Sequence, residues 1–135
     1  MNIFSKIKQE ILEAVSSLGS DLNVSSITTE FPKDPLHGDI STNAAMVLAP
    51  QLQMNPREVA VKIKDQMMKV SYIAHIEVAG PGFINFTIKL TKWHEYLSKI
   101  LEMGKDFGSC DIGNGERVNL EYVSTNPTGP IHIGH

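Results

Sequence analysis

The sequence predicts an α+β fold in which helices pack on a small, mainly antiparallel sheet, followed by the opening βα segment of a second, doubly wound domain. Three observations support this class. Apolar residues recur at helical spacing in several segments, two strand-like runs flank a glycine-rich turn, and a further strand-like run ends in a loop rich in proline and glycine. With 135 residues, the chain is long enough for one complete domain and little more.

Four segments have the features of helices, at residues 3–18, 41–52, 56–70 and 91–103. The first has apolar residues three and four positions apart and ends before Gly19. The second is alanine-rich, and Asp39 and Ser41 are both candidate N-caps. The third begins with Asn55 as the cap and Pro56 at the first helical position. The fourth ends at a glycine, residue 104.

Strands are expected between these helices. Residues 26–31 form a short β-branched run that two prolines follow, which is typical of an edge strand. Residues 75–79 and 83–88 form a hairpin around Gly80-Pro81-Gly82. Residues 117–123 form one more strand. We therefore divide the chain into an N-terminal domain (1–104), a polar linker (105–116) and the start of the second domain (117–135).

Composition excludes several classes of protein. The net charge is −3, so any contact with nucleic acid must be local. The single cysteine, Cys110, cannot form an internal disulfide, and no Cys/His cluster provides metal ligands. Charged residues interrupt the N-terminus before a signal-peptide core could form, and no apolar run is long enough for a membrane span. We expect a cytoplasmic protein with no metal site and no membrane contact.

The C-terminal segment carries the motif with the clearest chemistry. A strand that enters a loop containing proline and glycine is the opening unit of a nucleotide-binding sheet, whose ligands lie at the carboxyl end of the strand. Gly129 and Gly134 have the spacing of a phosphate loop. However, His135 stands where that loop requires a lysine, and no Ser or Thr follows it. The phosphate-loop interpretation therefore fails.

The string His132-Ile133-Gly134-His135 resembles the HIGH signature of class I aminoacyl-tRNA synthetases. The preceding residues, Glu-Tyr-Val-Ser-Thr-Asn-Pro-Thr-Gly-Pro at 121–130, resemble the arginyl-tRNA synthetases in particular. Upstream segments at 38–45, 55–60 and 77–85 resemble the N-terminal additional domain of that family. The resemblance covers essentially the whole chain, and it identifies the second domain as the start of a Rossmann-type catalytic domain.

The resemblance implies roles for residues near the C-terminus. Activation of arginine by ATP develops negative charge on the phosphates, which His132 and His135 would stabilise at a helix N-terminus. The implied ATP-binding residues are Pro130, His132, Gly134 and His135. The implied arginine-binding residues are Glu121, Ser124 and Asn126. A carboxylate such as Glu121 pairs strongly with a guanidinium group.

The N-terminal domain is implied to contact the outer corner of tRNA, around the D-loop. The candidate tRNA-binding residues lie in one loop: His37, Gly38, Asp39, Ser41 and Asn43. An equally weighted alternative is that they are only turn and capping residues. Many relatives resemble Gly-Asp-Tyr-Gln or Gly-Asp-Phe-Gln here, whereas this chain has Ile40 and Ser41, which predicts weaker base-specific recognition.

The expected parent is an arginine–tRNA ligase that uses ATP with magnesium, arginine and tRNA(Arg). We expect this chain to be inactive alone, to need no cofactor and to be a monomer, with self-association through residues 117–135 as the alternative. The competing interpretation is a stand-alone RNA- or protein-binding module with a vestigial HIGH segment. A reading frame that continues past His135 would favour the enzyme.

Overall fold

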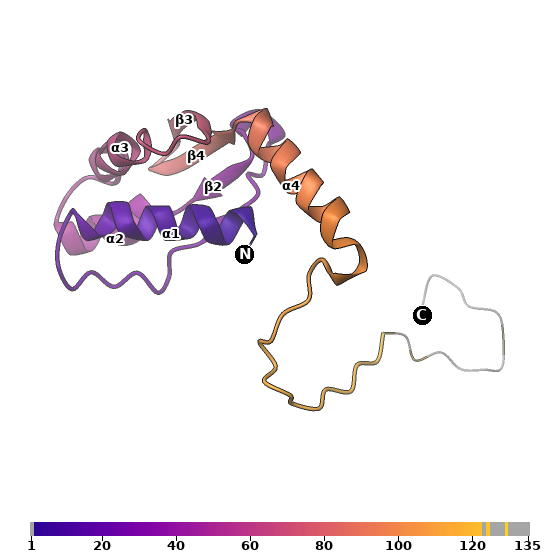
Figure 1. Ribbon diagram of the computed structural model, residues 1–135. Coiled ribbons are helices and arrows are strands. Elements are labelled where there is room, and N and C mark those ends of the chain that lie inside the picture. Colours follow the sequence, from indigo (N-terminus) through magenta and orange to yellow (C-terminus); the bar gives the residue numbers. More distant parts are fainter. Residues whose placement is uncertain (1, 123, 125–128, 130–135) are drawn as a thin grey trace.

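The structure is a computed structural model, and it describes residues 2–122, 124 and 129. Its elements in chain order are α1 (Ile3–Ser16), β1 (Thr29–Glu30), the 3-10 helix η1 (Pro35–His37), β2 (Ile40–Thr42), α2 (Ala44–Leu52), α3 (Pro56–Met67), β3 (Ile73–Ala79), β4 (Phe83–Ile88), α4 (Leu90–Met103) and the 3-10 helix η2 (Gly104–Asp106). Helices and a small antiparallel sheet in one chain confirm the α+β class (Figure 1).

The sheet has four strands in the order β1-β2-β4-β3, and every neighbouring pair is antiparallel. β3 and β4 form the expected hairpin around the glycine-rich turn. β1 is the expected edge strand, although it is only two residues long. The chain therefore pairs its shortest strands at one side of the sheet and its longest strands at the other.

One face of this sheet forms the hydrophobic core with α1, α2 and α3 (Figure 1). Ile40, Phe86 and Ile76 lie opposite one another across β2, β4 and β3, and all three are buried. Side chains alternate between the two faces of a strand, so this row assigns the intervening residues to the other face. Phe86 is completely buried, and we expect Phe86→Ala to lower the stability by about 3–5 kcal/mol.

Asparagine side chains cap the N-termini of two of the core helices. Asn2 Oδ1 accepts a hydrogen bond of 2.8 Å from the Ser5 amide at the start of α1. Asn55 Oδ1 accepts one of 2.9 Å from the Arg57 amide at the start of α3. These bonds pair backbone amides that have no partner within the helix. The predicted start of the third helix at Asn55 and Pro56 is confirmed.

The prediction of a helix from residue 41 was wrong at its start. Ile40–Thr42 is strand β2, and α2 begins at Ala44 after Asn43. β2 pairs with β1 on one side and with β4 on the other. These pairings bury all three of its residues, which outweighs the local preference of Asp39 and Ser41 for helix caps.

The strand expected at residues 117–123 was also wrong over the described residues 117–122, which form no strand. Val118, Leu120 and Tyr122 are all well exposed. A strand of a parallel sheet requires neighbours on both sides, and no described residue pairs with this segment. Residues 107–122 run as irregular chain after η2 (Figure 1).

α4 begins directly after β4 and extends away from the sheet (Figure 1). None of its residues is buried, and only Trp93 and Tyr96 among its large side chains pack partly against the core. Its apolar residues have the predicted helical spacing, but most of them are exposed. Within the described part of the chain, no helix has the length and apolar character that crossing a bilayer requires.

Candidate nucleic-acid interface

The face of the sheet opposite the core carries a row of polar residues. Glu30, Ser41, Asn85 and Glu77 lie opposite one another across β1, β2, β4 and β3. Neighbouring strands are about 4.8 Å apart, so the row brings hydroxyl, amide and carboxylate groups from four separate segments side by side. The strand register forms this row. It brings together residues as far apart in the sequence as Glu30 and Asn85, which are separated by 55 positions.

A cavity of about 430 Å³ lies over this row. Its lining residues are Glu30, Phe31, Pro32, Lys33, Asp34, His37, Ser41, Ala79, Gly80, Phe83 and Asn85. The sheet forms the floor, and the segment that follows β1 contributes a wall. Phe31 and Phe83 supply aromatic surface, and both are more than one-third exposed.

Two polar side chains in the floor have no partner within the described protein. Asn85 is only 5% exposed and Ser41 only 7%. Neither side chain forms a hydrogen bond to another described residue. No buried side-chain nitrogen or oxygen atom of the described residues lacks a partner, so the polar atoms of both must open onto the cavity. Their donors and acceptors are therefore accessible to a ligand that enters the cavity.

The turn that precedes β2 lies against β4. The Asp39 amide donates to the Phe86 carbonyl (2.8 Å), and the Ile88 amide donates to Asp39 Oδ2 (2.7 Å). His37 Nδ1 lies 4.0 Å from Glu77 Oε2, and both side chains are about half exposed. This distance is too long for a hydrogen bond, and an exposed ion pair contributes little to stability. Asp39 therefore holds this turn against β4 through both its backbone amide and its side-chain carboxylate.

The five residues predicted to contact tRNA have different surroundings in the structure. His37 and Ser41 line the cavity. Asp39 bonds to β4, and Asn43 accepts from the Thr28 amide (2.9 Å) and donates to the Ser26 carbonyl (3.1 Å). Gly38 contributes backbone alone, packed against Phe86 and Thr87. The structural alternative fits Asp39 and Asn43, whose side chains hold the loop together.

Sequence reasoning missed Phe83 and Asn85 as site residues. Two facts together identify them as site residues. Alternation along residues 83–88 puts Phe83 and Asn85 on one face of the strand, and pairing with β2 brings Ser41 beside Asn85. Ile40 stands where many relatives have an aromatic residue, and this difference predicted weaker base recognition. Its side chain is completely buried on the core face. Its side chain does not border the cavity, so that argument does not apply to this site.

The residues implied to bind arginine and ATP lie mainly outside the described part of the chain. Glu121 and Ser124 are described, and both are exposed. Asn126, Pro130, His132, Gly134 and His135 fall outside the described residues. Among the residues that are described, no group of three His, Cys, Asp or Glu side chains could hold a metal ion.

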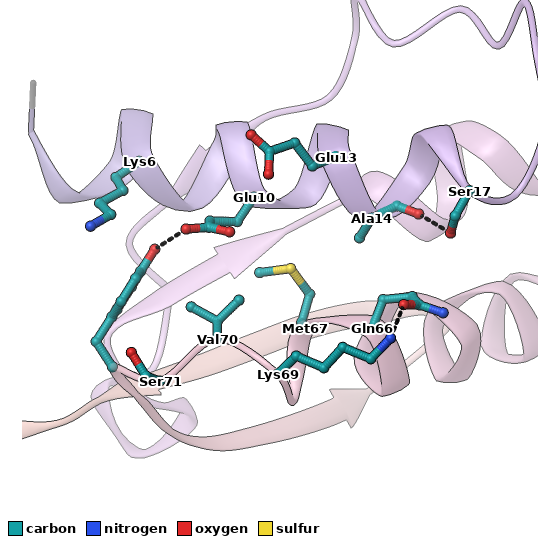
Figure 2. Close-up of a pocket in the computed structure, with 11 residues that line it drawn as sticks. Lys6, Glu10, Glu13, Ala14, Ser17, Gln66, Met67, Lys69, Val70 and Ser71 are labelled. Atoms are coloured by element: carbon teal, nitrogen blue, oxygen red, sulfur yellow. Dashed lines mark hydrogen bonds between the residues drawn. The ribbon is translucent and has the colours of Figure 1, made fainter.

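A second hollow, of about 510 Å³, lies between α1 and the end of α3, and Figure 2 shows its lining side chains. Its polar groups largely pair with one another: Tyr72 donates to Glu10 (3.3 Å), and Lys69 donates to Gln66 (2.8 Å). Burial, and then the Glu10 carboxylate, raise the pKa of Tyr72 well above its ordinary value. Because these groups already have partners, this hollow is the weaker candidate for a ligand site.

Comparison with known families gives a match to the part of the chain that contains the sheet and the cavity. Residues 5–88, which end with β4, match the family described as the arginyl tRNA synthetase N terminal domain. The chain belongs to this family. The match includes the whole sheet and both walls of the cavity, whereas α4 and everything after it lie beyond the matched residues.

Curated relatives extend the similarity over the full chain. Arginine–tRNA ligase from Azorhizobium caulinodans is 47% identical over 141 aligned residues, and the enzyme from Rickettsia akari is 48% identical over 136. Both alignments cover 100% of this chain and 24% of the relative. The chain therefore spans about a quarter of the length of these relatives.

A solved structure matches the fold. The crystal structure of arginyl-tRNA synthetase from Plasmodium falciparum superposes with a TM-score of 0.63 at 16% identity. The match covers 73% of this chain and 18% of that one. At this identity the similarity concerns the arrangement of helices and strands, and the site residues must be argued from this chain alone.

Proposed function

We propose that this chain is a tRNA-contacting part of an arginine–tRNA ligase, and that the cavity on the open face of the sheet takes one unpaired base from the D-loop region of tRNA(Arg). The single observation that carries the proposal is the buried pair of polar side chains, Asn85 and Ser41, that open onto a cavity with aromatic surface.

The chemistry of the cavity suits a nucleobase. Bases in single-stranded loops are bound by stacking on aromatic rings and by hydrogen bonds to their edges. The side-chain amide of Asn85 offers a donor and an acceptor side by side, the pattern that asparagine uses on adenine. Phe83, two residues earlier on the same strand and face, offers a ring beside that amide.

The net charge of −3 also favours a base over a phosphate as the principal contact. The cavity lining holds two carboxylates, from Glu30 and Asp34, against a single lysine, Lys33. Phosphates would be repelled by the carboxylates, whereas exocyclic amino groups of a base can donate to them. The lining therefore favours the face and edge of a base.

The test is binding of a tRNA(Arg) transcript to the 135-residue chain, measured by fluorescence anisotropy. We expect Asn85→Ala to raise the Kd by about 10- to 100-fold, equivalent to roughly 1–3 kcal/mol for one good bidentate contact. Asn119→Ala, at an exposed asparagine in the irregular segment, is the matched control and should bind like the wild type. Equal Kd values for the two variants would refute the base-binding role of Asn85.

The proposal for the longer parent is that it activates arginine with ATP and transfers it to tRNA in the cytoplasm. His132 and His135 would stabilise charge on the phosphates, with Pro130 and Gly134 beside the nucleoside. Glu121, Ser124 and Asn126 would bind arginine. Magnesium would accompany ATP. These roles rest on the motif and on the relatives, which are arginine–tRNA ligases.

The 135-residue chain itself is proposed to be a non-catalytic monomer that needs no cofactor. Arginine-dependent exchange of pyrophosphate into ATP is the direct assay. We expect no exchange above background with the purified chain. Exchange that disappears in His132→Ala would show that the chain is catalytic alone, and sedimentation equilibrium would detect self-association.

A further inference from the structure

Phe31 is the most exposed large apolar side chain that lines the cavity. It follows β1 directly and is 73% exposed, whereas Phe83 is 38% exposed. A single exposed apolar side chain is common on protein surfaces. Phe31 differs because it borders a cavity whose floor contains two unpaired polar side chains.

The ring of Phe31 is held in place although it is exposed. It contacts Phe4 in α1 edge to face, with ring centroids 4.7 Å apart and planes at 69°. The hydroxyl of Thr29, in β1, donates to the Phe4 carbonyl (3.3 Å). Pro32 follows Phe31 and restricts its backbone to extended conformations. The first turn of α1 therefore positions this wall of the cavity.

The two aromatic residues come from different parts of the sheet, because Phe31 directly follows β1 and Phe83 is the first residue of β4. β2 lies between β1 and β4, which places the backbones of β1 and β4 roughly 10 Å apart across the sheet. The cavity occupies the space over β2 that separates them. Both residues line the cavity, so a base within it has aromatic side chains available from two separate segments.

We propose that Phe31 is a second stacking wall for the base, and that Phe4 is a positioning residue that acts through Phe31. This inference rests on the proposed function. Stacking accepts any base because every base has a π-face, whereas an amide distinguishes base edges. Phe31 therefore sets the affinity for an unpaired base, and Asn85 sets which base is preferred.

The experiment compares the wild-type 135-residue chain with Phe31→Ala, using a tRNA(Arg) transcript and a set of transcripts in which each D-loop base is changed in turn. We expect Phe31→Ala to raise the Kd roughly 5- to 100-fold for every transcript alike, the effect of losing one base–aromatic stack. Phe31→Trp should bind like the wild type. Leu36→Ala removes a side chain that is 90% exposed but outside the cavity lining, and it should leave the Kd unchanged.

The role of Phe4 is tested with Phe4→Leu and Phe4→Tyr. Leucine keeps apolar packing against the core but loses the ring contact, so it should weaken RNA binding while the melting temperature stays close to that of Phe4→Tyr. Phe4→Tyr should retain binding. In the double variant Phe4→Leu, Phe31→Ala, the Kd should equal that of Phe31→Ala alone, because Phe4 acts only through Phe31.

Three results would contradict the inference in different ways. If Phe31→Ala binds within twofold of the wild type while Phe83→Leu and Asn85→Ala bind weakly, Phe31 is not a stacking wall, although the cavity still binds RNA. If none of the three variants changes the Kd, the proposed function of the cavity fails as well. A loss confined to one transcript in Phe31→Ala would contradict the assignment of base preference to Asn85.

Discussion

Gly38, in the turn that precedes β2, should be harder to replace than Gly80 in the cavity lining. Its φ is 91° and its ψ is −158°, a region that only glycine occupies readily and that costs other residues about 1–3 kcal/mol. A Cβ atom there would lie 2.9 Å from the Phe86 carbonyl oxygen and 3.0 Å from Thr87 Oγ1. Phe86 is in a central strand and completely buried, so its backbone cannot move aside cheaply. We expect Gly38→Ala to lower the stability by about 2–4 kcal/mol.

Thermal unfolding measures this effect. For a domain of this size, a loss of 1 kcal/mol lowers Tm by about 4–8 °C, so Gly38→Ala should melt about 8–32 °C below the wild type. Gly80 also has a positive φ (52°), but a Cβ there would have no neighbour within 4 Å, so Gly80→Ala should cost only about 1 kcal/mol. Gly113→Ala meets no neighbour and should be neutral. If Gly38→Ala melts no lower than Gly80→Ala, the close packing of this turn on β4 does not contribute to stability.

Three other predictions concern different parts of the molecule. Deletion of residues 105–135 should leave a cooperative thermal transition, because the core lies entirely before residue 89; loss of the transition would show that the removed segment belongs to the first domain. Burial and Glu10 raise the pKa of Tyr72, so its contribution to stability is complete below about pH 10 and is lost as the pH rises further. The alkaline loss of stability should accordingly be shallower in Tyr72→Phe, and urea titrations of both proteins between about pH 9 and 11 that gave parallel curves would contradict this. In the longer parent, His132→Ala should slow arginine activation by about 10²–10³, and unchanged pyrophosphate exchange would remove His132 from its proposed role.

Local signals were sufficient for most of the helices and for the hairpin. The Asn55 cap with Pro56 predicts the start of α3 because both act within one turn of helix. The glycine-rich turn predicts the β3–β4 hairpin because the two strands are neighbours in the sequence. In each case the interaction that decides the structure lies within a few residues of the pattern that predicts it.

β2 could not be predicted in this way. Its sequence, Ile-Ser-Thr followed by Asn-Ala-Ala, has local features of a helix start. Its strand structure depends on pairing with β4, more than 40 residues later, as the partners Ile40 and Phe86 show. The segment at 117–122 shows the opposite case, because a strand-like pattern formed no strand where the described residues offered it no partner.

The same strand register builds the core and the candidate site. Ile40, Phe86 and Ile76 form one row toward the helices, and Ser41, Asn85 and Glu77 form the adjacent row toward the cavity. A slip of one residue in β2 would move Ser41 into the core and Ile40 onto the open face. The protein would then lose both the burial of Ile40 and the polar row at the cavity. The register that builds the core therefore also fixes the positions of the site residues, but it does not fix their chemistry. This explains why similarity of fold at 16% identity does not transfer the site, and why Asn85, Ser41 and Phe31 must be tested in this chain.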